Sequence, residues 1–265
     1  MSPRSITNVS RLEGHVAIVT GASRGIGRNM AVALAGAGCA VVIAARSVDE
    51  NPKLPGTIHA VAARINDGGG KALAVPCDIT SEESIAATVA ATLARFGRID
   101  CLVNNAGVMW LAKTADTPLK RWELVMRVNL TGTFLFTKAV IPVMREQKRG
   151  SLIAITTNGV LMTDAKKGGG SNAYWVSKAA VERLYRGLAS ELAPDGIAVN
   201  CLAPSGVVLT EGWEYASGGA KIPAEYVEAP EVMGEAAVLL AAQDASGITG
   251  QVLYSQQLLA AAHRA

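Results

Sequence analysis

The chain has 265 residues, of which 50% are hydrophobic and 18% charged, so it can bury a sizeable core and is not expected to be disordered. Its formal net charge of +3 gives no reason to expect a nucleic acid or an anionic membrane as a partner. Residues 1–11 are polar and predict a flexible N-terminal extension without a secretory signal. The four cysteines are scattered, with no C-x-x-C pair, which favours free thiols in a reducing, cytoplasmic compartment.

Apolar runs alternate with helical patterns along the whole chain. The apolar runs predict strands over 15–20, 40–44, 71–76, 100–104, 152–156, 197–202 and 251–254. The helical patterns predict helices over 25–37, 58–67, 81–96, about 119–147, 174–193 and 231–240. The least regular stretches are 47–57, 161–172 and 205–229, and long loops in a compact domain are usually functional or mobile.

The predicted strands are apolar at successive positions, so both of their faces should be buried. Such strands belong in a parallel sheet with helices on both sides. No change of composition marks a second domain, and no repeat of solenoid period is present. The sequence therefore predicts one α/β domain over residues 1–265, a three-layer doubly wound parallel sheet.

A glycine-rich turn joins the first predicted strand to the first predicted helix. It reads Thr20-Gly21-Ala22-Ser23-Arg24-Gly25-Ile26-Gly27 and is called the glycine loop below. Glycines allow a tight turn and a close backbone approach, and a helix N-terminus offers unpaired N–H groups to a pyrophosphate. The loop is therefore a candidate phosphate site, whose contacts are expected from Gly21, Ser23, Arg24, Gly25, Ile26 and Gly27. A plain structural turn is the alternative interpretation.

The spacing T-G-x-x-x-G-x-G, together with motifs further along the chain, resembles the short-chain dehydrogenase/reductase family. These motifs are Asn104-Asn105-Ala106-Gly107 after the fourth strand, Tyr174 with Lys178 in a Y-x-x-x-K pattern, and Asn200-Cys201-Leu202-Ala203-Pro204. The resemblance covers roughly residues 12–254, and residues 52–59 are similar to an insert in hydroxysteroid dehydrogenase-like members and in some bacterial terpenoid-alcohol dehydrogenases. It implies a Rossmann fold that binds a nicotinamide dinucleotide, with further contacts expected from Asp78, Ile79, Asn105, Ala106, Gly107, Tyr174, Lys178, Pro204 and Thr210.

The end of the second strand carries the signal for the kind of dinucleotide. A carboxylate there would bind the ribose 2′-hydroxyl of NAD and repel a 2′-phosphate. The strand ends instead in Ala44-Ala45-Arg46, and a guanidinium can hold a phosphate bidentately. Arg24 is a second cation placed for the same group. We therefore expect NADP(H), with NAD(H) as the alternative, and no metal.

Tyr174 and Lys178 are the expected acid–base pair. A residue four positions along a helix lies on the same face, so the lysine charge can favour the phenolate of a tyrosine whose ordinary pKa is about 10. The family resemblance implies that the tyrosine exchanges a proton with the substrate oxygen and that the lysine also holds the nicotinamide ribose. The activity expected is hydride transfer between nicotinamide and a carbonyl/alcohol pair.

Two further catalytic roles follow from the resemblance. The family serine that holds the substrate oxygen aligns with Thr157, which keeps a hydroxyl; Thr156 and Ser171 are the alternatives. The matching family asparagine bends its helix and supports a proton relay to the lysine, and here it is Asn129. A tolerated polar residue is the alternative for Asn129. The family's Pro-Gly is replaced by Pro204-Ser205-Gly206, and we expect this one-residue difference to shift residues 207–210 relative to the nicotinamide.

Aromatic and apolar residues follow the expected site residues and suggest a lipophilic ketone or secondary alcohol as substrate. They are Met109, Trp110, Leu161, Met162, Trp175, Trp213 and Tyr215, the last two in a segment, 205–229, expected to act as a substrate lid. A role in the core or at a subunit interface is equally open for Trp110 and Trp175. Apolar surface at Trp122, Met126 and Phe134 is compatible with a homo-oligomer, a tetramer or a dimer. Two other interpretations remain: a catalytically weak NADP(H)-binding sensor or scaffold, and an NAD⁺-linked alcohol dehydrogenase.

Overall fold

The computed structural model describes residues 12–161 and 170–264. Within these ranges the chain forms a seven-stranded sheet, ordered β3-β2-β1-β4-β5-β6-β7, in which every neighbouring pair is parallel. The strands are β1 Val16–Thr20, β2 Ala40–Ala45, β3 Lys71–Pro76, β4 Cys101–Asn104, β5 Gly150–Ile155, β6 Ile197–Ala203 and β7 Val252–Tyr254. The doubly wound α/β class expected from the sequence is confirmed. The extension 1–11 lies outside the described residues.

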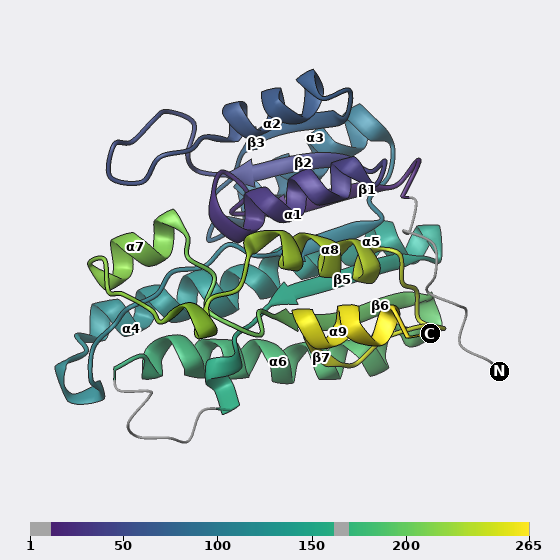
Figure 1. Ribbon diagram of the computed structural model, residues 1–265. Helices are drawn as coiled ribbons and strands as arrows, with labels where there is room; N and C mark the ends of the chain where they lie inside the picture. Colours follow the sequence, from purple (N-terminus) through teal and green to yellow (C-terminus); the bar gives the residue numbers. More distant parts are fainter. Residues whose placement is uncertain (1–11, 162–169, 265) are drawn as a thin grey trace.

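Helices cover both faces of the sheet (Figure 1). The helices on one face are α1 Gly25–Gly36, α2 Ile58–Asp67, α8 Pro230–Ala241 and α9 Ser255–Ala262. The helices on the other face are α3 Glu82–Phe96, α5 Thr133–Gln147 and α6 Asn172–Leu192, with α4 Leu119–Met126 packed against α6. Four short helical turns lie at Thr114–Asp116, Asn158–Leu161, Ala193–Asp195 and Ala224–Tyr226.

Each central strand supplies side chains to two separate cores. Val19 and Ile43 belong to the cluster under α1 and α8, whereas their neighbours Ile18 and Val42 belong to the cluster under α5 and α6. Successive side chains of a strand point to opposite faces, and here both faces are covered. This double burial explains why the strands are apolar at every position rather than at alternate ones.

The helical stretch expected over 119–147 is continuous but not uniform. A π-helical segment, Arg127–Gly132, joins α4 to α5, and such segments often lie at functional sites. By length and composition alone the stretch would pass as a membrane-spanning helix. Phe136, Val140 and Met144 on it are buried in the core, which accounts for its apolar composition.

Two helices were not expected from the sequence: α9 and, within the irregular segment 205–229, α7 Glu211–Ser217. Thr210 caps α7, because its Oγ1 accepts a hydrogen bond from the backbone N–H of Trp213 at 3.1 Å. A cap residue followed by Glu211 and Glu214 in the first turn is a helix-start signal, although the helix is too short to show an apolar period.

Candidate active site

Most of the expected site residues lie at one edge of the sheet. The glycine loop follows β1, residues 105–107 follow β4, Thr157 lies just beyond β5, and Pro204 follows β6. β1 and β4 are neighbours, yet the chain leaves them toward opposite faces, to α1 and to α4 with α5. Open parallel sheets bind ligands at the carboxyl ends of such a pair of strands.

The glycine loop is held in place by residues that follow β4. The side-chain amide of Asn105 donates to the carbonyl oxygens of Thr20 at 2.9 Å and of Gly21 at 3.2 Å. Thr20 Oγ1 accepts from the backbone N–H groups of Asn105 and Ala106, each at 3.0 Å. A Cβ atom at Gly21 would lie 2.8 Å from Ala106 Cα, and one at Gly27 would collide with the Asn105 amide. Both glycines are therefore required by this contact between the two motifs.

These residues fit a dinucleotide. The loop has no Cβ atoms at its points of close approach, and the first turn of α1 carries no acidic residue. Gly25 begins the helix with φ +56°, a conformation that favours glycine. The first N–H groups of a helix have no intrahelical partner and attract anions. Ser23 is buried and Ile26 is partly buried beside them, so the pyrophosphate of a dinucleotide would be held here.

The Arg24 side chain lies against the segment that contains the insert. Its Nε donates to Pro55 O at 2.9 Å, and its Nη2 donates to Leu54 O and Gly56 O, each at 2.8 Å, and to Ser47 Oγ at 2.9 Å. The Arg24 guanidinium, which was expected to bind the cofactor phosphate, therefore already donates to four acceptors of the protein. Its binding to a 2′-phosphate stays a prediction, and it would need some of these bonds to be exchanged.

The other groups expected around the adenosine end lie near one another. Arg46 is exposed at the end of β2, and no acid stands at that strand end. The pKa of Asp78 is lowered, chiefly by the hydrogen bond from the Thr80 backbone N–H at 2.9 Å and in part by the positive charges of Arg46 and Arg127. Ile79 beside it is buried. Among the described contacts, the Arg46 guanidinium has no carbonyl acceptors of the kind that bind Arg24.

Tyr174 and Lys178 lie one turn apart on α6, as expected from their spacing. Lys178 is 4% exposed, and its Nζ donates to the carbonyl oxygen of Ile155, the last residue of β5, at 2.6 Å. Nζ also lies 5.7 Å from the centroid of the Tyr174 ring. A Cβ at Gly107 would lie 3.7 Å from Nζ, so the N-N-A-G motif approaches the lysine directly.

The pKa of Tyr174 differs from the expectation based on the sequence. We expected the lysine charge to favour the tyrosine phenolate, but burial raises the pKa of Tyr174 to about 12. Burial also lowers the pKa of Lys178 to about 8. Removal from water disfavours the charged form of both groups. Tyr174 is therefore a protonated phenol at neutral pH.

Asn129 is fully buried in the π segment and fixes the loop that follows β4. Its Oδ1 accepts from the Val108 N–H at 2.8 Å, and its Nδ2 donates to Val108 O and to Ser177 Oγ, each at 3.0 Å. Both amide protons are used, so only Oδ1 can take a further hydrogen bond. These bonds exclude the interpretation that Asn129 is only a tolerated polar residue. Its part in a proton relay stays a prediction.

The three hydroxyls considered for the serine role differ in their surroundings. Thr156 is 2% exposed, and its hydroxyl donates to Glu182 Oε1 at 2.6 Å, so it is held against α6. Thr157 is partly exposed, and its Oγ1 accepts from the Gly159 N–H at 3.2 Å, which leaves its proton available. Ser171 lies at the start of α6. Thr157 is the best placed of the two threonines to meet a substrate oxygen.

A buried carboxylate that the sequence did not reveal supports the turn after β6. Glu228 is 2% exposed, and its Oε2 accepts from the backbone N–H groups of Ser205 at 2.9 Å and Gly206 at 3.3 Å. Its Oε1 accepts from Ser255 Oγ at 2.7 Å. The unusual Pro204-Ser205-Gly206 turn therefore has its own anchor. No spacing rule predicts that an acid 23 residues away would reach it.

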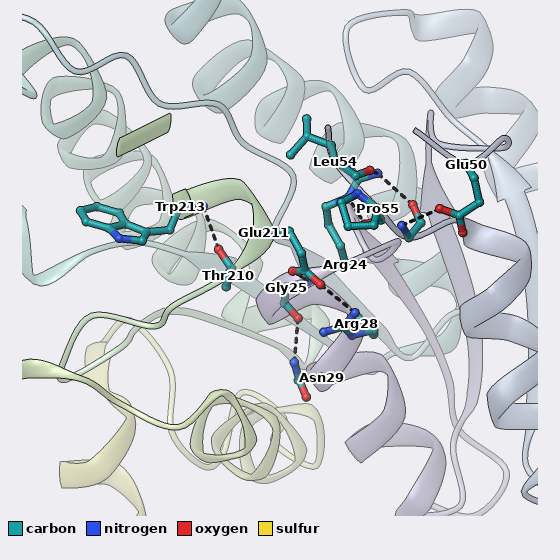
Figure 2. A network of polar contacts seen from close by, with 11 residues as sticks. Arg24, Gly25, Arg28, Asn29, Glu50, Leu54, Pro55, Thr210, Glu211 and Trp213 are labelled. Carbon is teal, nitrogen blue, oxygen red and sulfur yellow. Dashed lines mark hydrogen bonds and ion pairs between the residues drawn. The ribbon is translucent and has the colours of Figure 1, made fainter. Parts of the chain in front are cut away.

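The segment that begins at Thr210 touches the glycine loop. Figure 2 shows Glu211 beside Gly25 and Arg28. Its Oε2 accepts from the Gly25 N–H at 3.1 Å, and its Oε1 lies 2.8 Å from Arg28 Nη1. A Cβ at Gly25 would lie 3.2 Å from Thr210 Cβ, so the start of α7 packs directly on α1.

The tryptophans expected around the substrate are partly buried. The Trp175 indole packs on Gly159, where any side chain would collide with it. Trp110 stacks on the Arg121 guanidinium, with 4.5 Å between its ring centroid and Cζ. Of the other expected pocket residues, Met162 lies outside the described residues.

Comparison with known proteins defines the class of this chain. Residues 15–218 match the family model described as short chain dehydrogenase, and the chain belongs to this family. A "Hydroxysteroid dehydrogenase-like protein 2" from Danio rerio is 35% identical over 254 residues, which cover 96% of this chain and 60% of that protein. The chain thus spans about 60% of the length of this relative.

Solved structures show the same fold. One from Xanthomonas campestris, provisionally named a dehydrogenase, has a TM-score of 0.83 and 38% identity and covers 95% of this chain and 90% of that one. Another, from Beutenbergia cavernae, is provisionally named an NAD(P)-dependent gluconate 5-dehydrogenase and holds NADP at low occupancy. It has a TM-score of 0.80 and 36% identity, over 96% of this chain and 100% of that one.

Proposed function

We propose that this protein is an NADP(H)-dependent oxidoreductase that transfers a hydride between nicotinamide and a ketone or secondary alcohol. The observation that carries the proposal is the position of Tyr174 and Lys178. They lie on α6 beside the residue that follows β4, and that same strand end holds the glycine loop. A proton-transfer group and a phosphate cradle are thereby built on one edge of the sheet.

The protein's part in the reaction is to bind, orient and supply a proton. The bound dinucleotide would supply or accept the hydride. The Tyr174 hydroxyl gives its proton to the substrate oxygen as a carbonyl is reduced, and Thr157 Oγ holds the same oxygen by a hydrogen bond. Burial raises the pKa of Tyr174 to about 12, so at neutral pH the phenol carries the proton that this step requires.

The proposed preference for NADP(H) rests on charge at the end of β2. Arg46 is exposed, and the strand ends in two alanines where an NAD-specific site would carry an acid. The NADP in the Beutenbergia cavernae structure supports the choice by analogy. NADPH should therefore give at least tenfold higher kcat/KM than NADH, and the reverse order would assign NAD(H) instead.

The proposed substrate is lipophilic, because the expected pocket residues are largely aromatic or apolar. We also propose that the protein works in the cytoplasm as a homo-oligomer, without nucleic acid or membrane partners. A panel of bulky apolar ketones and small 2-oxo acids, assayed with NADPH, tests the substrate class. The best activity on a 2-oxo acid would refute it.

The experiment that tests the activity compares the wild type with Tyr174→Phe. Loss of the phenolic oxygen should lower kcat by about 10²–10⁴-fold, the usual contribution of positioned acid–base catalysis, while NADPH affinity is retained. NADPH oxidation and cofactor fluorescence measure the two quantities separately. If the wild type binds NADPH but reduces nothing in the ketone panel, the chain is a dinucleotide sensor or scaffold and the proposal is wrong.

A further inference from the structure

A carboxylate lies where the glycine loop should receive phosphate. Glu211, the first residue of α7, accepts a hydrogen bond from the backbone N–H of Gly25, the first residue of α1, at 3.1 Å (Figure 2). The side chain is 23% exposed. This N–H is one of the donors that a helix start offers to a dinucleotide pyrophosphate.

Two arginines lie near this carboxylate: Arg28 forms an ion pair with it, and Arg24 attracts its charge without a hydrogen bond to it among the described contacts. Arg28, one turn along α1, pairs with it at 2.8 Å, and its own side chain is 33% exposed. Arg24, the other nearby cation, points toward residues 47–56 and has its hydrogen bonds there. A pyrophosphate would therefore approach a glycine loop on which one donor and one cation are already engaged by an anion of the protein.

We propose that Glu211 is an affinity-determining residue that competes with the pyrophosphate of the dinucleotide for the start of α1. The inference rests on the proposed dinucleotide site and adds an antagonist to it. Like charges within one helix turn repel, and a hydrogen-bond donor given to the carboxylate is withheld from the phosphate. The docking of α7 on the glycine loop and the binding of the cofactor thus oppose each other.

The alternative is that Glu211 strengthens dinucleotide binding, and the direction of the change in Kd distinguishes the two. Glu211 could fasten α7 over a bound cofactor, since Thr210 beside it packs on Gly25. In that case the carboxylate would assist binding through its pair with Arg28. The Gly25 contact favours competition, because a fastening pair with Arg28 alone would not require a donor from the phosphate loop.

Glu211→Gln separates charge from shape. The amide keeps an oxygen that can accept from the Gly25 N–H, but it carries no charge to repel a phosphate or neutralise Arg28. We expect the Kd for NADPH, measured by fluorescence titration at low salt, to fall threefold to tenfold. The gain should shrink as the salt concentration rises, because ions screen a partly exposed charge.

Glu214→Gln is the matched control. It removes the same charge from an exposed position of the same helix, where the side chain has no contact with α1 among those described, and it should leave the Kd unchanged. An equal or higher Kd for Glu211→Gln overturns the inference, as does an equal gain for Glu214→Gln. If the wild type binds neither NADPH nor NADH, the proposed function itself fails. Melting temperatures of both variants show whether the fold is intact.

Discussion

Lys178 keeps an amine in a place where its charge is costly. Burial lowers its pKa from 10.5 to about 8, and each pKa unit corresponds to about 1.4 kcal/mol. The unfolded chain binds more protons than the folded one between these values, so this destabilisation is complete below pH 8 and fades as the pH rises toward 10.5. The pKa of Tyr174 is raised from 10 to about 12, so the folded chain binds more protons than the unfolded one between these values. The contribution of Tyr174 to stability therefore falls with pH, but only above pH 10.

Lys178→Met should therefore stabilise the fold at neutral pH while abolishing activity. The charge penalty is about 3 kcal/mol, and loss of the hydrogen bond to Ile155 O offsets about 1 kcal/mol of the gain. We expect a net gain of about 1–2 kcal/mol at pH 7 that vanishes by pH 10. Urea unfolding at both pH values measures it, and a pH-independent difference would contradict the assignment.

The hydroxyl of Thr157 should matter for turnover rather than for stability. Thr157→Val keeps the shape but removes the group that holds the substrate oxygen, so kcat should fall by about 10²-fold, the scale of one lost transition-state hydrogen bond. Thr157→Ser should retain most activity. Thr156→Val is the control: it loses the bond to Glu182, which contributes about 1 kcal/mol of stability, but should leave kcat within a factor of about three. The reversed pattern would move the role to Thr156.

At this scale the sequence placed residues better than it predicted their physical state. Tyr174, Lys178 and Asn129 were assigned by spacing and resemblance, and the structure brings the first two within one turn and the third beside them through Ser177. The direction of the tyrosine pKa was wrong, because desolvation depends on burial that no local pattern encodes. The hydrogen bonds of the Arg24 guanidinium were also missed, because its carbonyl partners lie about 30 residues away in the sequence.

The turn after β6 depends on an element at the far end of the chain. Glu228 joins Ser205 and Gly206 to Ser255 at the start of α9. Glu228→Ala would remove the acceptor of the Gly206 N–H and one of the two acceptors of the Ser205 N–H, which keeps Ser255 Oγ at 3.1 Å. An unsatisfied buried donor costs about 1–3 kcal/mol. Because this turn leads to Thr210, the KM for the cofactor should rise at least tenfold.

Glu228→Gln provides the test of positioning. Its amide oxygen can still accept from Ser205 and Gly206 while its NH₂ donates to the Ser255 hydroxyl, so cofactor KM should return to within about threefold of wild type. Steady-state kinetics and thermal melts of both variants separate the effects. Equal KM values in all three proteins, with only the melting temperature lowered, would reduce Glu228 to a structural role.

Elements with strong periodicity were predicted well, and elements defined by caps or by tertiary contact were not. The bounds of α2 and β3 agree with the sequence prediction to the residue. The π segment around Asn129 has no apolar signature, because it is fixed by hydrogen bonds to Val108 and Ser177. Helix α7 is only seven residues long, too short for a periodic pattern to appear.

The whole molecule leaves apolar side chains exposed on the α4–α6 side. Phe134 on α5 is 46% exposed and Val176 on α6 is 44% exposed. Exposed apolar groups of this size on helices fit a subunit interface. We expect sedimentation to show a dimer or tetramer at micromolar concentration, and Phe134→Arg to shift it toward monomer. Phe134→Leu should leave the assembly unchanged, and a monomeric wild type would refute the interface.

The fold was predictable because the composition of the strands and their alternation with helices both indicate a parallel sheet. Strands such as β1 and β6 are buried at every position, and apolar runs separated by helical patterns allow few arrangements other than a parallel sheet with two covered faces. The order of the strands across the sheet was supplied by the structure. What pattern could not supply was the contact of distant loops, such as Glu211 with the glycine loop.

The bonds of Ser255 have a consequence for synthesis of the protein. Ser205 and Glu228 meet a hydroxyl that the ribosome adds some 50 and 27 residues after them, and Ser205 N–H lies 3.1 Å from it. A growing polypeptide can assemble the glycine loop and most of the sheet while that hydroxyl is still missing. The turn at Ser205 can therefore acquire its full set of hydrogen bonds only after Ser255 has been added to the chain.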